Sequence, residues 1–99
     1  MIQPSSHQFI VGVDLGGTNI VTGALSVDGS RTFGVRSAPT DVSAGAEGVV
    51  DRIVAQIEAT VADTMREAGV GRDAVRGIGI GAPGPLDRER GLVIVAPNL

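Results

Sequence analysis

The chain contains no cysteine, no lysine, no tryptophan and no tyrosine among its 99 residues. Without cysteine, it can form neither a disulfide nor a thiolate metal site. Its aromatic residues are Phe9 and Phe33 alone, so it offers no stacking platform for unpaired bases. The formal net charge is -3, and the basic residues, all of them arginine, form no run. This charge pattern argues against nucleic acid and against an anionic membrane surface as partners.

Long apolar runs and a secretory leader are absent as well. No run approaches the length of a membrane span, and the opening MIQPSSHQ lacks the basic and then apolar order of a signal peptide. Hydrophobic residues make up 42% of the chain and charged residues 19%, which is typical of a globular domain. We therefore expect one small domain over residues 9–99, preceded by a disordered tail over residues 1–8.

Three β-strands are predicted in the first part of the chain. The apolar run FIVGVDL, Phe9–Leu15, predicts a strand that is buried on both faces. A second strand over residues 19–27 and a third over residues 31–37 are joined by a tight turn at Asp28-Gly29, and together the three predict an antiparallel meander. In the second strand Val21, Gly23, Leu25 and Val27 share one face, and in the third Phe33 and Val35 are expected to face the core.

A helix and two further strands follow. Over residues 46–68 the apolar spacing becomes helical, with Ser43 as the expected N-cap and Gly69 as the residue that ends the helix. Strands are predicted over residues 75–81 and 92–96, with a charged turn over residues 87–91 between them. The order β-β-β-α-β-β predicts an α/β domain with a mixed five-stranded sheet and a parallel crossover through the helix.

The stretch VGVDLGGTN places an acid and two glycines where the first strand ends. Gly16 and Gly17 have no side chain to shield the backbone, so their amides can approach an anion closely. Asp14 fits beside a phosphate when a metal lies between them, since a carboxylate and phosphate oxygens together suit Mg²⁺. Thr18 and Asn19 add neutral donors. A hairpin turn capped by Asp14 is the simpler alternative.

A second glycine cluster, Gly79-x-Gly81-x-x-Gly84, matches a dinucleotide-binding fingerprint. That motif requires a helix to begin directly after it. Pro85 intervenes here and the next predicted element is a strand, so we reject that interpretation. A stiff loop at a strand end and a substrate-contacting loop both remain open. His7 lies in the tail, the charged residues 87–90 form a solvated turn, and no catalytic triad or carboxylate pair can be assembled.

Three blocks of the sequence resemble the N-terminal lobe of ROK-family sugar kinases, such as the bacterial glucokinases. They are VGVDLGGTNIVTGALSVDG, GIGIGAPGPLD and GLVIVAPNL, in the family's order and spacing. The first block alone is shared more widely with actin-like ATPases. The resemblance implies a ribonuclease-H-like lobe that faces a second lobe across a cleft for ATP and sugar. The implied enzyme is cytoplasmic and, at full length, a homo-oligomer.

The resemblance also implies roles for particular residues. The family transfers the γ-phosphoryl group of Mg-ATP to a hexose hydroxyl, with glucose as the foremost substrate. Its phosphate loop corresponds to Asp14, Gly16, Gly17, Thr18 and Asn19, with Asp14 beside the metal. Its sugar-flanking residues correspond to Ala82, Pro83, Gly84 and Asn98.

The chain also departs from the family pattern. The family's catalytic Asn-Asp pair, its Cys/His zinc cluster and its sugar-binding Glu and His residues all lie beyond Leu99. We therefore assign no catalytic residue, and we expect these 99 residues to be inactive alone.

Two other interpretations remain. One is a non-catalytic, sugar-sensing ROK regulator, although only eight residues precede Phe9 and a DNA-binding module needs more. The other is a stable domain whose phosphate loop is vestigial. For this domain, isolated from its partner lobe, we expect an exposed apolar patch on the C-terminal strand and the cleft face, and self-association at high concentration.

Overall fold

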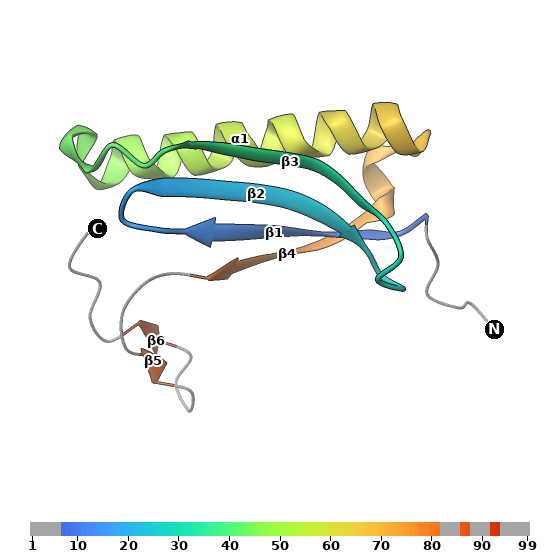
Figure 1. Cartoon of the computed structure of the whole chain (residues 1–99), viewed down its shortest axis with the longest axis horizontal. Helices are drawn as coiled ribbons and strands as arrows, with labels where there is room; N and C mark the ends of the chain where they lie inside the picture. The colour runs from blue at the N-terminus through green and yellow to red at the C-terminus, as the bar shows by residue number, and fades with distance from the viewer. Residues whose placement is uncertain (1–6, 82–85, 88–91, 94–99) are drawn as a thin grey trace.

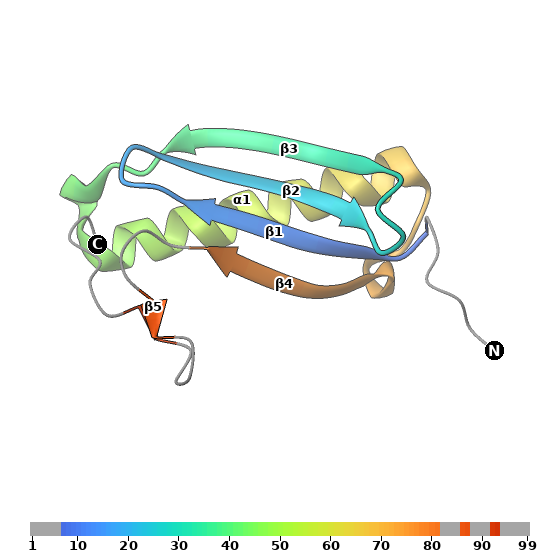
Figure 2. The ribbon, with the colours of Figure 1, turned by 60° about the horizontal axis from the view of Figure 1, so that its bottom comes forward.

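The computed structural model describes residues 7–81, 86–87 and 92–93 of the chain. One long helix, α1, lies across one face of a four-stranded sheet (Figure 1). The strands lie in the order β3-β2-β1-β4, with β4 at an edge (Figure 2). In chain order the elements are β1 (Phe9–Leu15), β2 (Asn19–Ser26), β3 (Thr32–Pro39), the 3-10 turn η1 (Val42–Ala44), α1 (Gly45–Ala68), the 3-10 turn η2 (Arg72–Ala74), β4 (Val75–Gly81), β5 (Leu86–Asp87) and β6 (Leu92–Val93).

The predicted meander and the parallel crossover are both confirmed. β1 pairs antiparallel with β2, β2 pairs antiparallel with β3, and β4 returns beyond α1 to pair parallel with β1. The Asp28-Gly29 turn is also present, with Gly29 at a φ of 78°. The Asp28 carboxylate accepts hydrogen bonds from Ser30 and Ser26, and these bonds lower its pKa.

The predicted five-stranded sheet is wrong, because the main sheet has four strands in the part of the chain that the structure describes. Of the last apolar segment the structure describes Leu92–Val93, which pairs antiparallel with Leu86–Asp87 in a separate two-stranded sheet. The two short strands are separated by four residues, so closing a loop between them loses little chain entropy. Leu92–Val93 therefore pair locally and not with the main sheet. This pairing also puts a strand, and not a helix, after the second glycine cluster.

The core lies between α1 and one face of the sheet. The residues of β1 alternate, with Phe9, Val11, Val13 and Leu15 buried beneath α1 and the residues between them exposed. The expectation that this strand is buried on both faces is therefore wrong, because α1 covers one face only in the described part of the chain. The helix contributes Val49 and Val61 to this core, as its spacing predicted.

The prediction for the C-terminal end of α1 is confirmed, and the prediction for its N-terminal end is wrong. Gly69 ends the helix in the left-handed conformation, with a φ of 69°, and donates its amide to the Met65 carbonyl, as expected. Ser43 is not the N-cap. It lies within η1, where its hydroxyl donates to the Asp41 carboxylate, and Ala44 precedes the helix without a side-chain cap.

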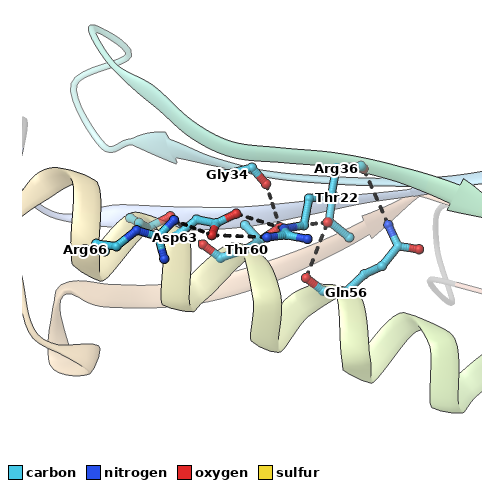
Figure 3. Close-up of polar contacts among 8 residues, drawn as sticks. Thr22, Gly34, Arg36, Gln56, Thr60, Asp63 and Arg66 are labelled. Carbon is cyan, nitrogen blue, oxygen red and sulfur yellow. Dashed lines mark hydrogen bonds and ion pairs between the residues drawn. The ribbon is translucent and has the colours of Figure 1, made fainter.

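Threonines join the helix to the sheet through a buried polar network (Figure 3). Thr60 Oγ1 donates to the Gly34 carbonyl at 2.7 Å and lies 2.7 Å from Thr22 Oγ1. Gln56 Nε2 donates to the Ile20 carbonyl of β2 at 3.0 Å. Each polar atom loses contact with water, so these bonds fix how the helix lies on the sheet.

A bulge in β3 turns Val35 away from the core. Phe33 lies opposite Ala24 and Arg36 opposite Thr22, so Gly34 and Val35 together face one residue of β2. Gly34 adopts a φ of 62°, and a Cβ there would lie 2.8 Å from the Thr60 carbonyl oxygen. The prediction for Phe33, which packs against the core, is confirmed, and the prediction for Val35, which is 65% exposed, is wrong.

The sheet face opposite α1 is apolar and open in the described part of the chain. Exposed aliphatic side chains there include those of Ile10, Leu25 and Val35. Gly23, Gly12 and Gly79 lie side by side across β2, β1 and β4, and leave bare backbone between them. The patch expected on the C-terminal strand and the cleft face stays a prediction, because most of that strand lies outside the described residues. Of the helices described, none is long and apolar enough to cross a bilayer.

Candidate functional site

The loop between β1 and β2 lies at the edge of the sheet where two parallel strands end together. Asp14 is the penultimate residue of β1, and its partner across the ladder is Gly81, the last residue of β4. The carboxyl ends of parallel strands are where α/β sheets bind ligands, because the loops that leave them can enclose a crevice. The acid and the glycine loop therefore occupy the edge that this fold class uses for binding.

Gly16 is required by close contact within the turn. Its amide donates to the Asn19 carbonyl at 2.9 Å, and this bond closes the hairpin. A Cβ on Gly16 would lie 3.0 Å from the same Asn19 oxygen, closer than most side chains tolerate. Gly16 is not among the glycines with positive φ. Position 16 therefore favours glycine because there is no room for a Cβ, and not because the backbone is left-handed.

Thr40 holds the loop from the end of β3. Its hydroxyl donates to the Gly16 carbonyl at 2.8 Å, and its amide donates to the Thr18 carbonyl at 2.9 Å. Thr40 is completely buried. Arg52 of α1 approaches the Thr40 carbonyl at 3.5 Å and donates to the Asp41 carboxylate at 3.1 Å. Thr40 thus holds the loop directly, and Arg52 supports it through Thr40 and Asp41.

No sequence pattern indicates this contact between Thr40 and the glycine loop. Thr40 follows a predicted strand and Pro39, and a single threonine there carries no motif. The only signal is indirect, since a hairpin loop with two glycines needs outside contacts to keep one conformation.

Two amides of the loop remain available to a ligand. Within the described part of the chain, the N–H groups of Gly17 and Thr18 donate no hydrogen bond. Gly17 is half-buried, and Thr18 and Asn19 are exposed. Thr40 binds the carbonyls of Gly16 and Thr18 and so holds the loop in one conformation. The amides of Gly17 and Thr18 are therefore already in place before a ligand binds. Preformed donors of this kind suit an anion.

Asp14 is the acid nearest this loop in sequence. Its side chain is exposed on the open face, where it lines one end of a groove of about 470 Å³ with Gly12 and Gly79. Among the described residues, no three acidic or histidine side chains gather into a metal site. A lone carboxylate fits a magnesium ion that takes its other ligands from phosphate oxygens and water.

The remaining predicted site residues are not all described. Ala82, Pro83, Gly84 and Asn98 lie outside the described residues. Gly81, which precedes the first three, is paired with Asp14. His7 is exposed and lies before β1, at the opposite end of that strand from the loop.

The chain is similar to known glucokinases over most of its own length. No protein-family model matches the chain. Over 89 residues, or 90% of the chain, it is 40% identical to a glucokinase of Thermotoga maritima and 35% identical to a glucokinase of Streptomyces coelicolor. The chain spans only about a quarter of these relatives, 25% and 24% of their lengths.

A solved structure gives the same result. The chain matches a ROK-family glucokinase from Streptomyces griseus, in complex with glucose and AMPPNP, with a TM-score of 0.68 and 34% identity. The match covers 92% of this chain and 25% of that one. Over the stretch that they share, the chain is similar in sequence and in fold to these glucokinases.

Proposed function

We propose that the chain is the phosphate-binding part of an ATP-dependent sugar kinase, with a ribonuclease-H-like fold. In the complete enzyme the γ-phosphoryl group of Mg-ATP passes to a hexose, with glucose as the foremost substrate. The chain spans a quarter of its relatives, so we expect it to be inactive alone. A cytoplasmic location and homo-oligomeric assembly of the complete enzyme stay predictions.

One observation carries this proposal. The glycine loop is held at two carbonyls by Thr40 and keeps the amides of Gly17 and Thr18 unpaired within the described residues. A simple hairpin turn does not need such support. The nucleotide analogue in the Streptomyces griseus relative supports ATP as the ligand, and the glucose in that structure supports a hexose as the acceptor.

In this proposal the site residues would bind different parts of the two substrates. The Gly17 and Thr18 amides bind phosphate oxygens, and a hydrogen bond to a charged group is worth roughly 1.5–3 kcal/mol. Asp14 holds the magnesium ion, whose positive charge offsets the charge that the phosphates carry. Thr18 and Asn19 add side-chain donors. Ala82, Pro83, Gly84 and Asn98 flank the sugar.

A chimeric enzyme tests the proposal. The 89 residues that align with the Thermotoga maritima glucokinase replace their counterparts in that enzyme, and glucose phosphorylation is measured. We expect activity in the chimera and a loss of most of it on Asp14→Ala, with Asp28→Ala as the matched control in the hairpin at the other end of β2. Circular dichroism shows whether each protein folds. A folded chimera that binds glucose but turns over no ATP would favour the sugar-sensing alternative.

A further inference from the structure

Asp41 has an unusual backbone conformation directly after Thr40, the residue that holds the glycine loop. Its φ of 52° and ψ of 68° lie in the left-handed region, and in the described part of the chain it is the one residue other than glycine with a positive φ. This conformation costs free energy in any residue with a Cβ, and aspartate tolerates it because its short side chain can form local hydrogen bonds. Strain of this kind persists where surrounding contacts hold it, and it gathers at functional sites.

Three contacts hold Asp41 in the left-handed conformation. One carboxylate oxygen, Oδ2, accepts a hydrogen bond from Nη2 of Arg52 at 3.1 Å, and the other, Oδ1, accepts one from the Ser43 hydroxyl. The Asp41 carbonyl accepts a hydrogen bond from the Ala44 amide at 3.1 Å. Ser43 and Ala44 belong to the short turn η1, so of these three contacts only the one with Arg52 joins Asp41 to α1.

The guanidinium group of Arg52 contacts two successive residues at the end of β3. Its Nη1 lies 3.5 Å from the Thr40 carbonyl oxygen, while its Nη2 donates to the Asp41 carboxylate. Because the guanidinium is planar and holds its donors in fixed directions, it fixes the carbonyl of one residue relative to the carboxylate of the next. Thr40 is therefore held on two sides, since its amide and hydroxyl bind the glycine loop and its carbonyl faces Arg52.

The ion pair between Arg52 and Asp41 is too exposed to contribute much to overall stability. The side chain of Arg52 is 36% exposed and that of Asp41 is 45% exposed. Ion pairs exposed to this extent add little to the free energy of unfolding, because water and salt screen them. The effect of the pair should therefore fall on the position of Thr40 and not on the stability of the whole fold.

We propose that Arg52 and Asp41 are positioning residues for nucleotide binding, and that their ion pair keeps Thr40 where it donates to both loop carbonyls. When the pair is broken, Asp41 leaves the left-handed conformation, Thr40 is no longer fixed, and the unpaired amides of the loop lose their common direction. Phosphate then binds more weakly, because the loop must be ordered at the expense of binding free energy. The effect on nucleotide binding rests on the proposed function, whereas the effect on the loop can be measured without a ligand.

Arg72 and Glu58 provide a matched control at the other end of α1. Their side chains form an ion pair of 3.0 Å, close to the 3.1 Å between Arg52 and Asp41, and both are exposed. Arg72 lies in η2, beyond the C-terminal end of α1, whereas Arg52 lies toward the end of α1 that is near the loop between β1 and β2 (Figure 1). Arg52→Gln and Arg72→Gln therefore each break one exposed ion pair, and only the first removes a contact with Thr40.

Amide relaxation in the ligand-free chain, measured by nuclear magnetic resonance, tests the effect on the loop. We expect order parameters of about 0.85 for the Gly17 and Thr18 amides in the native chain, and a fall toward about 0.6 in Arg52→Gln. Arg72→Gln should leave these order parameters unchanged, and the two variants should have similar midpoints in urea. Adding Asp41→Asn to Arg52→Gln should loosen the loop no further, because the two residues act as a pair.

Titration of the same proteins with Mg-ATP tests the consequence for binding. We expect the dissociation constant to rise at least about tenfold in Arg52→Gln, because affinity falls in proportion to the fraction of molecules whose loop is in the binding conformation. The dissociation constant should not change in Arg72→Gln.

Each failure has a distinct meaning. Equal order parameters in the native chain and Arg52→Gln, or equal loosening of the loop by Arg72→Gln, would overturn the positioning role. Equal affinity of the native chain and Arg52→Gln for Mg-ATP would overturn the effect on nucleotide binding. A loop that loosens in Arg52→Gln alone, in a chain that binds no Mg-ATP, would support the positioning role and contradict the proposed function.

Discussion

The hydroxyl of Thr40 lies 2.8 Å from the carbonyl oxygen of Gly16, and this bond joins the end of β3 to the glycine loop. The Thr40 amide makes a second bond to the loop, at the Thr18 carbonyl. Thr40 is completely buried, so water cannot replace either bond. The shape of the loop therefore depends on a residue more than twenty positions along the chain.

Replacing Thr40 with valine should loosen the loop. The variant keeps the shape of the side chain but leaves the Gly16 carbonyl without its donor, which should lower the free energy of unfolding by about 1–2 kcal/mol. Urea denaturation measures this change, and hydrogen exchange should be faster at the Gly16 amide, which donates to the Asn19 carbonyl within the loop. Thr40→Ser keeps the hydroxyl and should restore most of the protection. Equal exchange in Thr40→Val and the native chain would show that the hydroxyl does not hold the loop.

Gly34→Ala should be among the most damaging small substitutions in the chain. Gly34 has a φ of 62°, and an added Cβ would lie 2.8 Å from the Thr60 carbonyl oxygen of α1. Gly29→Ala is the matched control, because Gly29 has a φ of 78° with nothing within 4 Å of its Cβ. A residue other than glycine in this conformation costs about 1–2 kcal/mol, and Gly34→Ala should exceed that by at least about 1 kcal/mol because the helix must also move. Similar midpoints in urea for both variants would contradict this packing.

Thr22 and Thr60 should be energetically coupled. Their hydroxyl oxygens lie 2.7 Å apart, and the Thr60 hydroxyl donates a hydrogen bond to the Gly34 carbonyl. In a double-mutant cycle of Thr22→Val and Thr60→Val, we expect a coupling energy of roughly 0.5–2 kcal/mol, as for other residues of one buried network. Thr64→Val serves as the control partner for Thr22, since Thr64 donates to the Thr60 carbonyl within the helix. Strict additivity of the Thr22 and Thr60 variants would show that their contact adds no stability.

Asp63 should make the chain sensitive to acid. Hydrogen bonds from Arg36 and then Arg66 lower the pKa of Asp63 from 3.8 to about 2 (Figure 3). A carboxyl group whose pKa is lower in the folded state stabilises the fold above its unfolded pKa. That stability is lost as the pH falls through the folded value, here between about pH 4 and pH 2.

Urea titrations at a series of pH values check this effect. The free-energy difference between the native chain and Asp63→Asn should be largest above about pH 4 and should shrink toward pH 2. Asp51→Asn is the control, because Asp51 is exposed on the same helix and makes none of the ion pairs found among the described residues. A difference for Asp63→Asn that does not change with pH would contradict the effect.

The sequence predicts those parts of the fold that local pattern controls. The apolar spacing of α1, its end at Gly69 and the run of β1 are properties of neighbouring residues, and all three are confirmed. The errors arise where distant contacts decide the outcome. Val35 faces outward because β3 has one extra residue opposite β2, where Gly34 packs closely against Thr60 of α1. The pairing of Leu92–Val93 with Leu86–Asp87 is an exception, because it joins segments that are close along the chain.

The candidate site divides in the same way. Asp14, Gly16 and Gly17 are close together in the sequence, so the sequence alone predicts that they group at the end of a strand. Thr40 reaches the loop, and Arg52 reaches Thr40, only through the packing of β3 and α1, and no local pattern marks either residue. The roles of Ala82, Pro83, Gly84 and Asn98 stay predictions.

Binding of Mg-ATP to the glycine loop is the central claim, and a nuclear magnetic resonance titration of the isotopically labelled chain tests it most directly. We predict that Mg-ATP shifts the amide signals of Gly16, Gly17 and Thr18 progressively, and that Asp14→Ala or chelation of magnesium weakens the shifts. The Gly29 amide in the opposite hairpin is the internal control and should not move. Shifts absent from the loop, or identical in the native chain and Asp14→Ala, would contradict the assignment of this loop as the phosphate site.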